Sequence, residues 1–156
     1  MNKFLCYSHG TIRLALDIND NPIIAHFDNT NNRLMLSAWD SDNDTIPDYR
    51  DSLNSTGSDW VLETIDSTGA VGNYSSLALD SNQYPHIAYH DDTNDNLKYA
   101  HFNGTSWNIE IIDSSNSVGE YTSLAVDSNN NPHVAYYDDT NEYLKYAYYN
   151  GTSWNS

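Results

Sequence analysis

The chain has 156 residues, of which 22 are acidic and 6 are Lys or Arg, so its formal net charge is −16 at pH 7. Nucleic acids and anionic membrane surfaces bind clustered Lys and Arg, so this charge argues against both partners. No apolar stretch approaches the roughly 20 residues of a membrane span, so we expect no membrane insertion. Cys6 is the only cysteine, which excludes an intrachain disulfide.

The first recognisable segment, Leu14 to Leu34, is a divergent copy of a unit that occurs twice more later in the chain. Pro22 of this copy corresponds to Pro85 in the second copy and to Pro132 in the third, at spacings of 63 and 47 residues. The first spacing is longer because 16 extra residues, 40–55, are inserted into the first copy. A period of 47 residues predicts a stacked array, in which each unit buries its apolar face against a neighbour.

The insertion carries the sharpest local motif of the chain. Counted from its first aspartate, the motif has carboxylates at positions 1, 3, 5, 9 and 12, and position 7 offers a backbone carbonyl. The carboxylates belong to Asp40, Asp42, Asp44, Asp48 and Asp51, and the carbonyl belongs to Ile46. Those are the ligand positions of a 12-residue calcium loop, so we predict that this segment binds Ca²⁺ and stiffens the insertion. The alternative is a solvated acidic surface loop.

The twelve residues from Asp40 to Asp51 resemble the acidic calcium-binding repeat of thrombospondin type 3 and of many bacterial and archaeal surface proteins. Two departures stand out. Thr45 occupies the place of the glycine that eases the sharp turn, and Asp51 replaces the longer Glu of EF-hand loops.

The second copy contains four strand signals separated by turn residues, and no segment has a helical period. These strands are expected at Ser75–Leu79, His86–His90, Leu97–Phe102 and Trp107–Ile112. Between the last two strands, Asn103-Gly104 predicts a tight hairpin, since both residues accept positive φ. Four antiparallel strands in a repeat of this length predict an all-β protein, a β-propeller of about three blades.

The blades are expected at about 11–66, with the calcium-loop insertion at 40–55, at about 73–113, and at about 120–156, where the outer strand is incomplete. Three blades are too few to close a ring of four to eight. We therefore predict head-to-tail association of identical chains, with a dimer of six blades as the simplest closed form. The alternative is that the chain is part of a longer repetitive protein.

Several residues recur at the same place in successive copies. For His86 and His133 we favour a packing role between blades over a binding site, and Ile23 holds their place in the first copy. The tryptophans at positions 60, 107 and 154 are read as blade packing, with a sugar platform as the lesser alternative. Lys98 and Lys145 recur as well, and Met35 stands at their place. The Asp-Asp-Thr-Asn runs at 91–94 and 138–141 are explained by turn formation.

As a whole, the repeats resemble those of bacterial and archaeal extracellular β-propellers, and the Asn-Gly-Thr-Ser-Trp segments at 103–107 and 150–154 are similar to those of propeller lectins. The resemblance implies an extracellular or cell-surface setting, although the first residues lack the apolar region of a signal peptide. Sialidases and fucose lectins need arginines, and the second and third copies contain none.

We therefore predict a non-catalytic, calcium-stabilised propeller module for extracellular recognition or assembly, not an enzyme. Its expected partners are further copies of itself, together with glycans or surface proteins. Three alternatives remain: a carbohydrate-binding lectin, a self-assembling surface-layer or filament component, and a glycan hydrolase or lyase.

Overall fold

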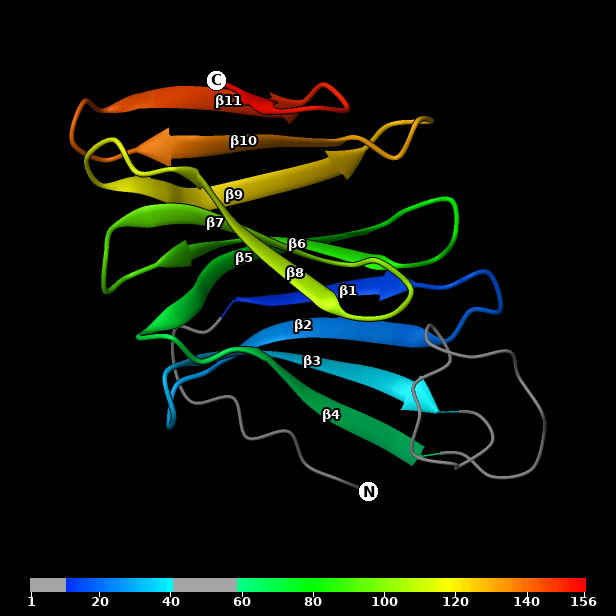
Figure 1. Cartoon of the computed structure of the whole chain (residues 1–156). Helices are drawn as coiled ribbons and strands as arrows, with labels where there is room; N and C mark the ends of the chain where they lie inside the picture. Colours follow the sequence, from blue (N-terminus) through cyan, green and yellow to red (C-terminus); the bar gives the residue numbers. More distant parts are fainter. Residues whose placement is uncertain (1–10, 41–58) are drawn as a thin grey trace.

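The computed structural model describes residues 11–40 and 59–156, and in these ranges every regular element is a β-strand. The strands form three four-stranded antiparallel sheets, which are stacked along one direction with the first sheet and the last at opposite ends (Figure 1). In each sheet the strands lie side by side in chain order, as in a propeller blade. This confirms the predicted fold class and the three blades per chain.

The first blade consists of β1 (Ile12–Leu16), β2 (Pro22–Asp28), β3 (Arg33–Asp40) and β4 (Asp59–Asp66). The second consists of β5 (Val71–Leu79), β6 (Pro85–Asp91), β7 (Asn96–Phe102) and β8 (Trp107–Asp113). The third consists of β9 (Val118–Val126), β10 (Pro132–Asp138), β11 (Tyr143–Tyr149) and β12 (Trp154–Asn155). The four strands predicted in the second blade are all present, and each extends slightly further than predicted.

The blades hold together through two apolar junctions. At each one, the first strand of a blade packs across three strands of the preceding blade: β5 against β1, β2 and β3, and β9 against β5, β6 and β7. The first junction buries a larger apolar cluster, which includes Leu34, Leu36 and Ile87, and the second is centred on Leu97, Val118 and Tyr136. Because both faces of the middle blade are covered, its strand β6 is buried at every residue.

An ion pair connects the two blades at each junction, beside the apolar cluster; it is buried at the first junction and partly buried at the second. Asp66, the last residue of the outer strand β4 of the first blade, accepts hydrogen bonds from Lys98 and from the Tyr89 hydroxyl, the latter at 2.8 Å. One repeat later, Lys145 and the Tyr136 hydroxyl donate to Asp113 at 2.5 and 2.7 Å. These contacts explain why Lys98 and Lys145 recur: each lysine ties its own blade to the blade before it.

Aspartates also make the turns between strands. Asp80 accepts hydrogen bonds from the backbone N–H groups of Asn82 and Tyr84 at 2.8 and 2.9 Å. Asp91 accepts from the backbone of Thr93 and Asn94 at 3.1 and 3.2 Å, which confirms the turn role of that run. Much of the acidic composition is therefore used to fix the backbone of the turns.

The hairpin after β7 differs in detail from the prediction. Gly104 has a φ of 91°, but Asn103 acts through its side chain. Its amide oxygen accepts hydrogen bonds from the backbone of Thr105 and Ser106, both at 3.0 Å, and its N–H donates to the Ser106 carbonyl at 3.1 Å. The turn is therefore longer than a two-residue hairpin, because the asparagine caps it from the side.

The acidic insertion lies in the corresponding hairpin of the first blade, between β3 and β4. Asp40 ends β3 at the repeat position of Asn103, and its side chain is buried. The other predicted calcium ligands, Asp42, Asp44, Ile46, Asp48 and Asp51, lie outside the described residues. Over residues 11–40 and 59–156, no helix is long and apolar enough to cross a membrane.

Candidate ligand pocket between the second and third blades

A cavity of about 330 Å³ opens at the junction between the second and third blades. The second blade contributes the turn after β5, strands β6 and β7, and the hairpin that leads into β8. The third blade contributes the turn after β9 together with the ends of β11 and β12. This volume falls within the range of about 300–1,000 Å³ that is usual for ligand sites.

One side of the cavity is a stack of three rings on β6 and β7. His101 lies nearly parallel to His86 and to Tyr99, with ring centroids 5.6 and 5.4 Å apart. The Tyr99 hydroxyl makes a short hydrogen bond to Nδ1 of His86. His86 and Tyr99 are buried, and His101 is half-buried toward the cavity that it lines. From the sequence we predicted only a packing role between blades for His86. In the structure this histidine also lines the cavity.

Burial fixes the charge of this stack. It lowers the pKa of His86 to about 4; the neighbouring His101 adds to the effect, and the Asp80 carboxylate opposes it. Burial also lowers the pKa of His101. The Asp80 carboxylate lies 3.8 Å from Nε2 of His86, which favours a proton on Nε2 and leaves Nδ1 to accept from Tyr99. At neutral pH the stack is therefore uncharged.

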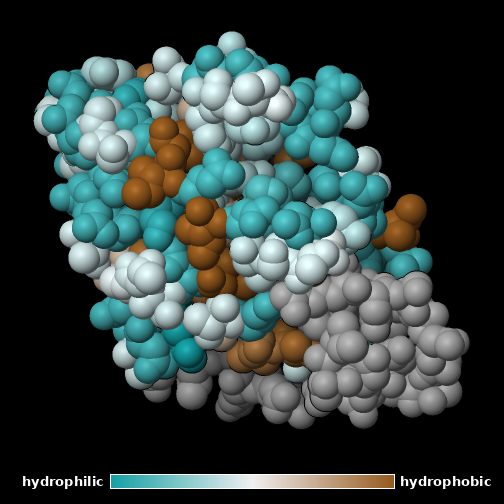
Figure 2. All heavy atoms as spheres, in the orientation of Figure 1, coloured by the Kyte–Doolittle hydropathy of each residue, from teal (hydrophilic) through white to brown (hydrophobic). Residues whose placement is uncertain are grey.

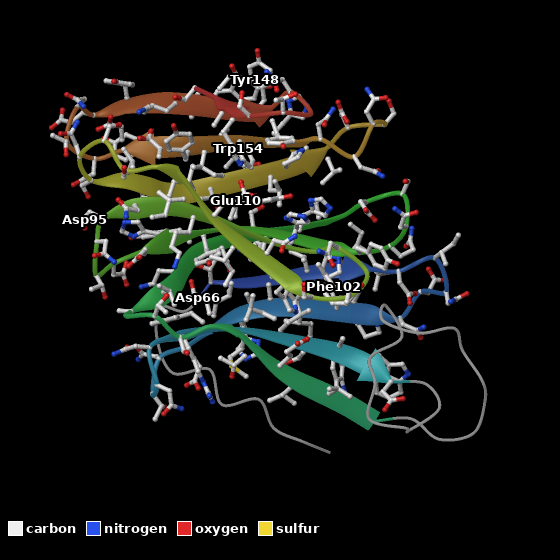
Figure 3. The ribbon with its side chains drawn as sticks, in the orientation of Figure 1. Asp66, Asp95, Phe102, Glu110, Tyr148 and Trp154 are labelled. Carbon is white, nitrogen blue, oxygen red and sulfur yellow. The ribbon has the colours of Figure 1, made fainter. Side chains whose placement is uncertain are left out.

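Trp154 forms the facing wall from β12. Its ring meets Tyr99 edge to face at 5.1 Å, across the junction, and meets Tyr149 of its own blade at 5.8 Å. Its indole N–H donates to Glu110 on β8 at 3.0 Å. Figure 3 shows Glu110 on β8, below Trp154 of the third blade. The tryptophan is thus held by both blades, and its position depends on their docking.

The rim of the cavity is polar. It includes the amide side chains of Asn82, Asn103, Asn130 and Asn131. The Asn130 amide oxygen accepts a hydrogen bond at 3.0 Å from the backbone of the second blade, which ties the rim together. Among the described residues that line the cavity there is no lysine and no arginine.

The same repeat positions explain why the cavity forms at this junction. In the first blade, Ile23, Leu36 and Ala38 stand where the second blade has its ring stack, and all three are buried in the apolar cluster. Across the junctions, Tyr84 packs against that first cluster, whereas Asn131 stands at the same position of the third blade. The second junction therefore has polar rings on one side and a smaller side chain on the other.

Sequence reasoning found part of this site. His86 and Trp154 were singled out, but as packing residues, whereas Tyr99, His101, Glu110 and Asn131 were missed. Aligning the three copies position by position would have indicated them, since an aliphatic set in one copy becomes a polar aromatic set in the next. Within residues 11–40 and 59–156, no group of three His, Cys, Asp or Glu side chains is placed to hold a metal ion.

The fold defines the class of protein: an all-β chain of three propeller blades, with an open junction between the last two. No protein-family model matches the chain, and no curated protein matches it in sequence. The functional argument therefore depends on the chemistry of the cavity.

Proposed function

We propose that this protein is a recognition module that binds a neutral sugar in the cavity between its second and third blades. The observation that carries the proposal is the mixed lining of the cavity. Rings such as Tyr99 and Trp154 stand beside carboxylate and amide groups. A sugar has apolar C–H groups on its faces and hydroxyl groups around its edge, so it needs both kinds of surface, and amphipathic rings suit such a ligand.

The charge of the molecule favours a neutral ligand over an anionic one. Asp80 and Glu110 line the cavity without a lysine or arginine among its described lining residues, and the chain carries a formal net charge of −16. A uronic or sialic acid would bring a further negative charge beside these carboxylates. Hydroxyl groups, in contrast, can donate to them, and the NH₂ groups of the rim amides can donate to sugar oxygens.

We propose binding and not glycan cleavage, because both carboxylates already have structural partners. Glu110 accepts the Trp154 indole N–H, and Asp80 holds the turn that contains Asn82 and Tyr84. Each carboxylate is thereby oriented as an acceptor at the edge of the cavity. A single open site of this kind predicts weak binding, with a Kd on the order of 1 mM, and repeated sites would add avidity.

A small organic cation is a second ligand class that the lining supports. Aromatic rings beside two carboxylates can attract an ammonium group through its charge and through cation–π contact. The rim amides favour the sugar, since an alkylammonium makes little use of them. An ammonium ligand would bind more weakly as salt increases, whereas binding of a neutral sugar would change little.

The calcium loop and the extracellular setting complete the proposal. We expect Ca²⁺ to bind at Asp40, Asp42, Asp44, Ile46, Asp48 and Asp51 and to order the β3–β4 insertion. The support for the ion is the spacing of the carboxylates in the sequence, and the support for the setting is the acidic composition together with the resemblance to surface proteins.

The proposal is tested with a panel of free sugars and tryptophan fluorescence, backed by ligand-observed saturation-transfer NMR. Galactose, glucose, mannose and N-acetylglucosamine are the neutral members; glucuronate and N-acetylneuraminate are the anionic ones, and choline represents the cations. We expect at least one neutral sugar to bind, Trp154→Ala to weaken binding in this cavity at least tenfold, and Tyr121→Ala to leave binding unchanged, since Tyr121 is exposed and away from the cavity lining. Binding of choline alone, binding of no member, or equal binding to Trp154→Ala would overturn the proposal.

A further inference from the structure

The outer face of the third blade has the side chains of a blade junction. Leu34, Leu97 and Leu144 occupy the same repeat position in the three blades. Leu34 and Leu97 are 0% exposed, each at the junction with the following blade, whereas Leu144 is 74% exposed. An apolar residue that is fully buried in two copies and open in the third marks a surface that fits another blade.

The neighbouring positions repeat this difference. His133, Tyr146 and Tyr148 form the same ring stack on the third blade that lines the cavity on the second, with Tyr146 and Tyr148 centroids 5.8 Å apart. Tyr99 is 2% exposed, but Tyr146 at its repeat position is 51% exposed. In Figure 3, Tyr148 lies on the side of the third blade away from the other two. The stack is therefore already formed before anything covers it.

The backbone of the third blade is also prepared for a further junction. Asn32 and Asp95 both have positive φ, 54° and 56°, and their carbonyls accept hydrogen bonds of 3.2 and 3.1 Å from Val71 and Val118 of the next blade. Glu142 stands at the same repeat position with a φ of 56°. Glu142 therefore has the same backbone conformation as Asn32 and Asp95, whose carbonyls accept the hydrogen bonds at the two internal junctions.

The matching half of a junction lies at the other end of the stack. Leu77 and Leu124 of the second and third blades pack against the blade that precedes each. Leu14 holds this repeat position in the first blade and is 62% exposed, and Ile12 and Leu16 on the same strand are also exposed. Strand β1 thus carries an apolar stripe that corresponds to the packed stripes of β5 and β9.

We propose that a second copy of this chain docks the β1 face of its first blade on the β11 face of the third blade, and that the same contact made in return closes a ring of two copies. The argument is continuity with the two junctions inside the chain. Each copy carries both halves of the contact. Docking would bury Leu144, Tyr146, Leu14 and Leu16 in the way that their repeat equivalents are buried.

The docked copy would also complete a second ligand cavity. At the internal cavity, the third blade contributes Asn131, Tyr149 and Trp154. The partner's Asn21, Trp39 and Trp60 hold those positions in the first blade, and the Trp39–Trp60 pair has nearly the same geometry as Tyr149–Trp154, edge to face at 5.5 Å and 5.8 Å. Facing them would be the ring stack of His133, Tyr146 and Tyr148. The ligand part of this inference rests on the proposed function; the docking does not.

The net charge gives the docking a recognisable salt dependence. Two copies that each carry −16 repel one another at low ionic strength, while apolar burial favours contact. Raising the salt concentration to about 0.5 M screens the repulsion and should strengthen association. A contact held by ion pairs would weaken instead.

The first test is the mass in solution, measured by light scattering after size exclusion at micromolar protein concentration. We expect twice the 17.6 kDa of one chain. Leu144→Glu should weaken the association about a hundredfold or more, since it would bury an unpaired charge. The control is Ile111→Glu, which places the same charge on a 56% exposed position of β8, outside the proposed contact. A mass of one chain in the unsubstituted protein, an open series of masses, or equal effects of the two variants would overturn the proposal.

A cross-link provides a readout that does not depend on the folding of Leu144→Glu. The Leu124 backbone N–H donates to the Ser76 hydroxyl at 3.0 Å across the second junction, and the repeat equivalents of this pair are Leu14 and Ser123. With Cys6→Ser as background, Leu14→Cys combined with Ser123→Cys should form a disulfide between copies on mild oxidation. Leu14→Cys alone, measured as the control, should give a lower yield of disulfide-linked dimer. Failure of the pair to cross-link, in a protein that remains folded, contradicts the proposed face.

The second cavity is tested by counting sugar sites on the assembled protein. Positions 21 and 131 are the repeat equivalents of Tyr84, which packs against the apolar cluster of the first junction, so a tyrosine at either position reproduces that packing. Asn131→Tyr should remove the internal site and Asn21→Tyr the one between copies, so that each reduces two sites per chain to one. If the protein is a dimer that binds no sugar, the docking stands and the proposed function fails. If the wild-type protein and Asn21→Tyr both bind one sugar per chain, the proposed second cavity is contradicted.

Discussion

Tyr84 and Asn131 occupy the same position in successive repeats, and their backbone N–H groups bond in the same way to Asp80 and Asp127, at 2.9 and 2.8 Å. Tyr84 packs against the apolar cluster of the first junction and also borders the cavity, whereas Asn131 lines the cavity from the third blade. This repeat position, with its backbone unchanged, thus presents an aromatic ring to the first junction and a smaller polar side chain to the second, and the ring stack replaces aliphatic residues on the opposite side. The function proposed here depends on that difference.

Acid should weaken the second junction before the first. The pKa of His86 is lowered by burial to about 4, against about 6.5 in the unfolded chain. Between these values the unfolded state binds a proton that the folded state does not, so stability falls as the pH decreases from about 6.5 to about 4. Urea unfolding at a series of pH values measures this slope.

The matched variant for this experiment is His86→Ile with Tyr99→Leu, which copies Ile23 and Leu36 of the first junction. It should fold and lose much of the slope between pH 6.5 and 4. An unchanged slope would show that other groups cause the acid sensitivity. Asp113 acts in a lower window: burial alone would raise its pKa, but hydrogen bonds from Lys145 and Ser115 hold the pKa at about 2, so its contribution is lost only below about pH 4.

The two lysines of the blade junctions should differ in their contribution to stability. Lys98 and Asp66 have side chains only 9% and 2% exposed, and the equivalent pair, Lys145 with Asp113, is 17% and 8% exposed. Lys98→Met follows the residue that Met35 provides in the first blade, and it leaves a buried carboxylate unpaired. We expect a loss of about 3 kcal/mol in the free energy of unfolding, and a smaller loss for Lys145→Met.

Chemical denaturation measures both lysine variants, and Asp66→Asn added to Lys98→Met serves as the control. It should restore part of the lost stability because it removes the unpaired charge. If Lys98→Met and Lys145→Met prove equal, or if the double variant recovers nothing, the ion pairs do not act as described.

Gly119 should tolerate no side chain. It has a φ of 102°, and a Cβ atom added to it would lie 2.8 Å from the Cα of Leu97, a backbone atom of the preceding blade. Gly119→Ala should therefore open the second junction, in addition to the cost of about 1–2 kcal/mol for a left-handed alanine. Gly151→Ala is the matched control, since its φ is 89° and nothing lies within 4 Å of its added Cβ. Thermal unfolding compares the two variants, and equal melting temperatures would contradict the close approach of the blades.

The test of the predicted calcium loop leaves its first aspartate, Asp40, unchanged. Asp40 is buried at the end of β3, so its replacement would disturb the fold whether or not an ion binds. Asp42→Asn with Asp44→Asn removes two predicted ligands and keeps the side-chain shape. In the unchanged chain, Ca²⁺ should raise the melting temperature relative to EDTA, and in the double variant this rise should disappear. A rise that persists, or one that Mg²⁺ produces equally, contradicts the assignment.

The fold was predictable because each level of the sequence agrees with the others. Repeats of 47 residues, β-branched and aromatic strands, and turns rich in Asp, Asn and Gly all indicate the same blade. The hairpin at Asn103 was predicted as a tighter turn, because the dipeptide rule does not include the capping of Thr105 and Ser106 by the asparagine side chain.

The cavity was less accessible to sequence reasoning. Its ring stack comes from β6 and β7, its tryptophan from β12, and Glu110 from β8, so the lining forms only when two blades meet. Periodicity predicts that each of these residues faces a junction. It does not predict whether the facing side chain fills the space, as Tyr84 does, or leaves it open, as Asn131 does.

The central claim is tested most directly by calorimetric titration of Asn131→Tyr beside the unsubstituted protein, with the neutral sugar that binds most tightly in the panel. Urea unfolding of both proteins shows whether the fold is kept. The account predicts that Asn131→Tyr unfolds with at least the original stability, since tyrosine is accommodated at this position in the first junction, and that it loses one sugar site per chain. A stably folded Asn131→Tyr that binds the sugar with unchanged affinity and number of sites would contradict the account.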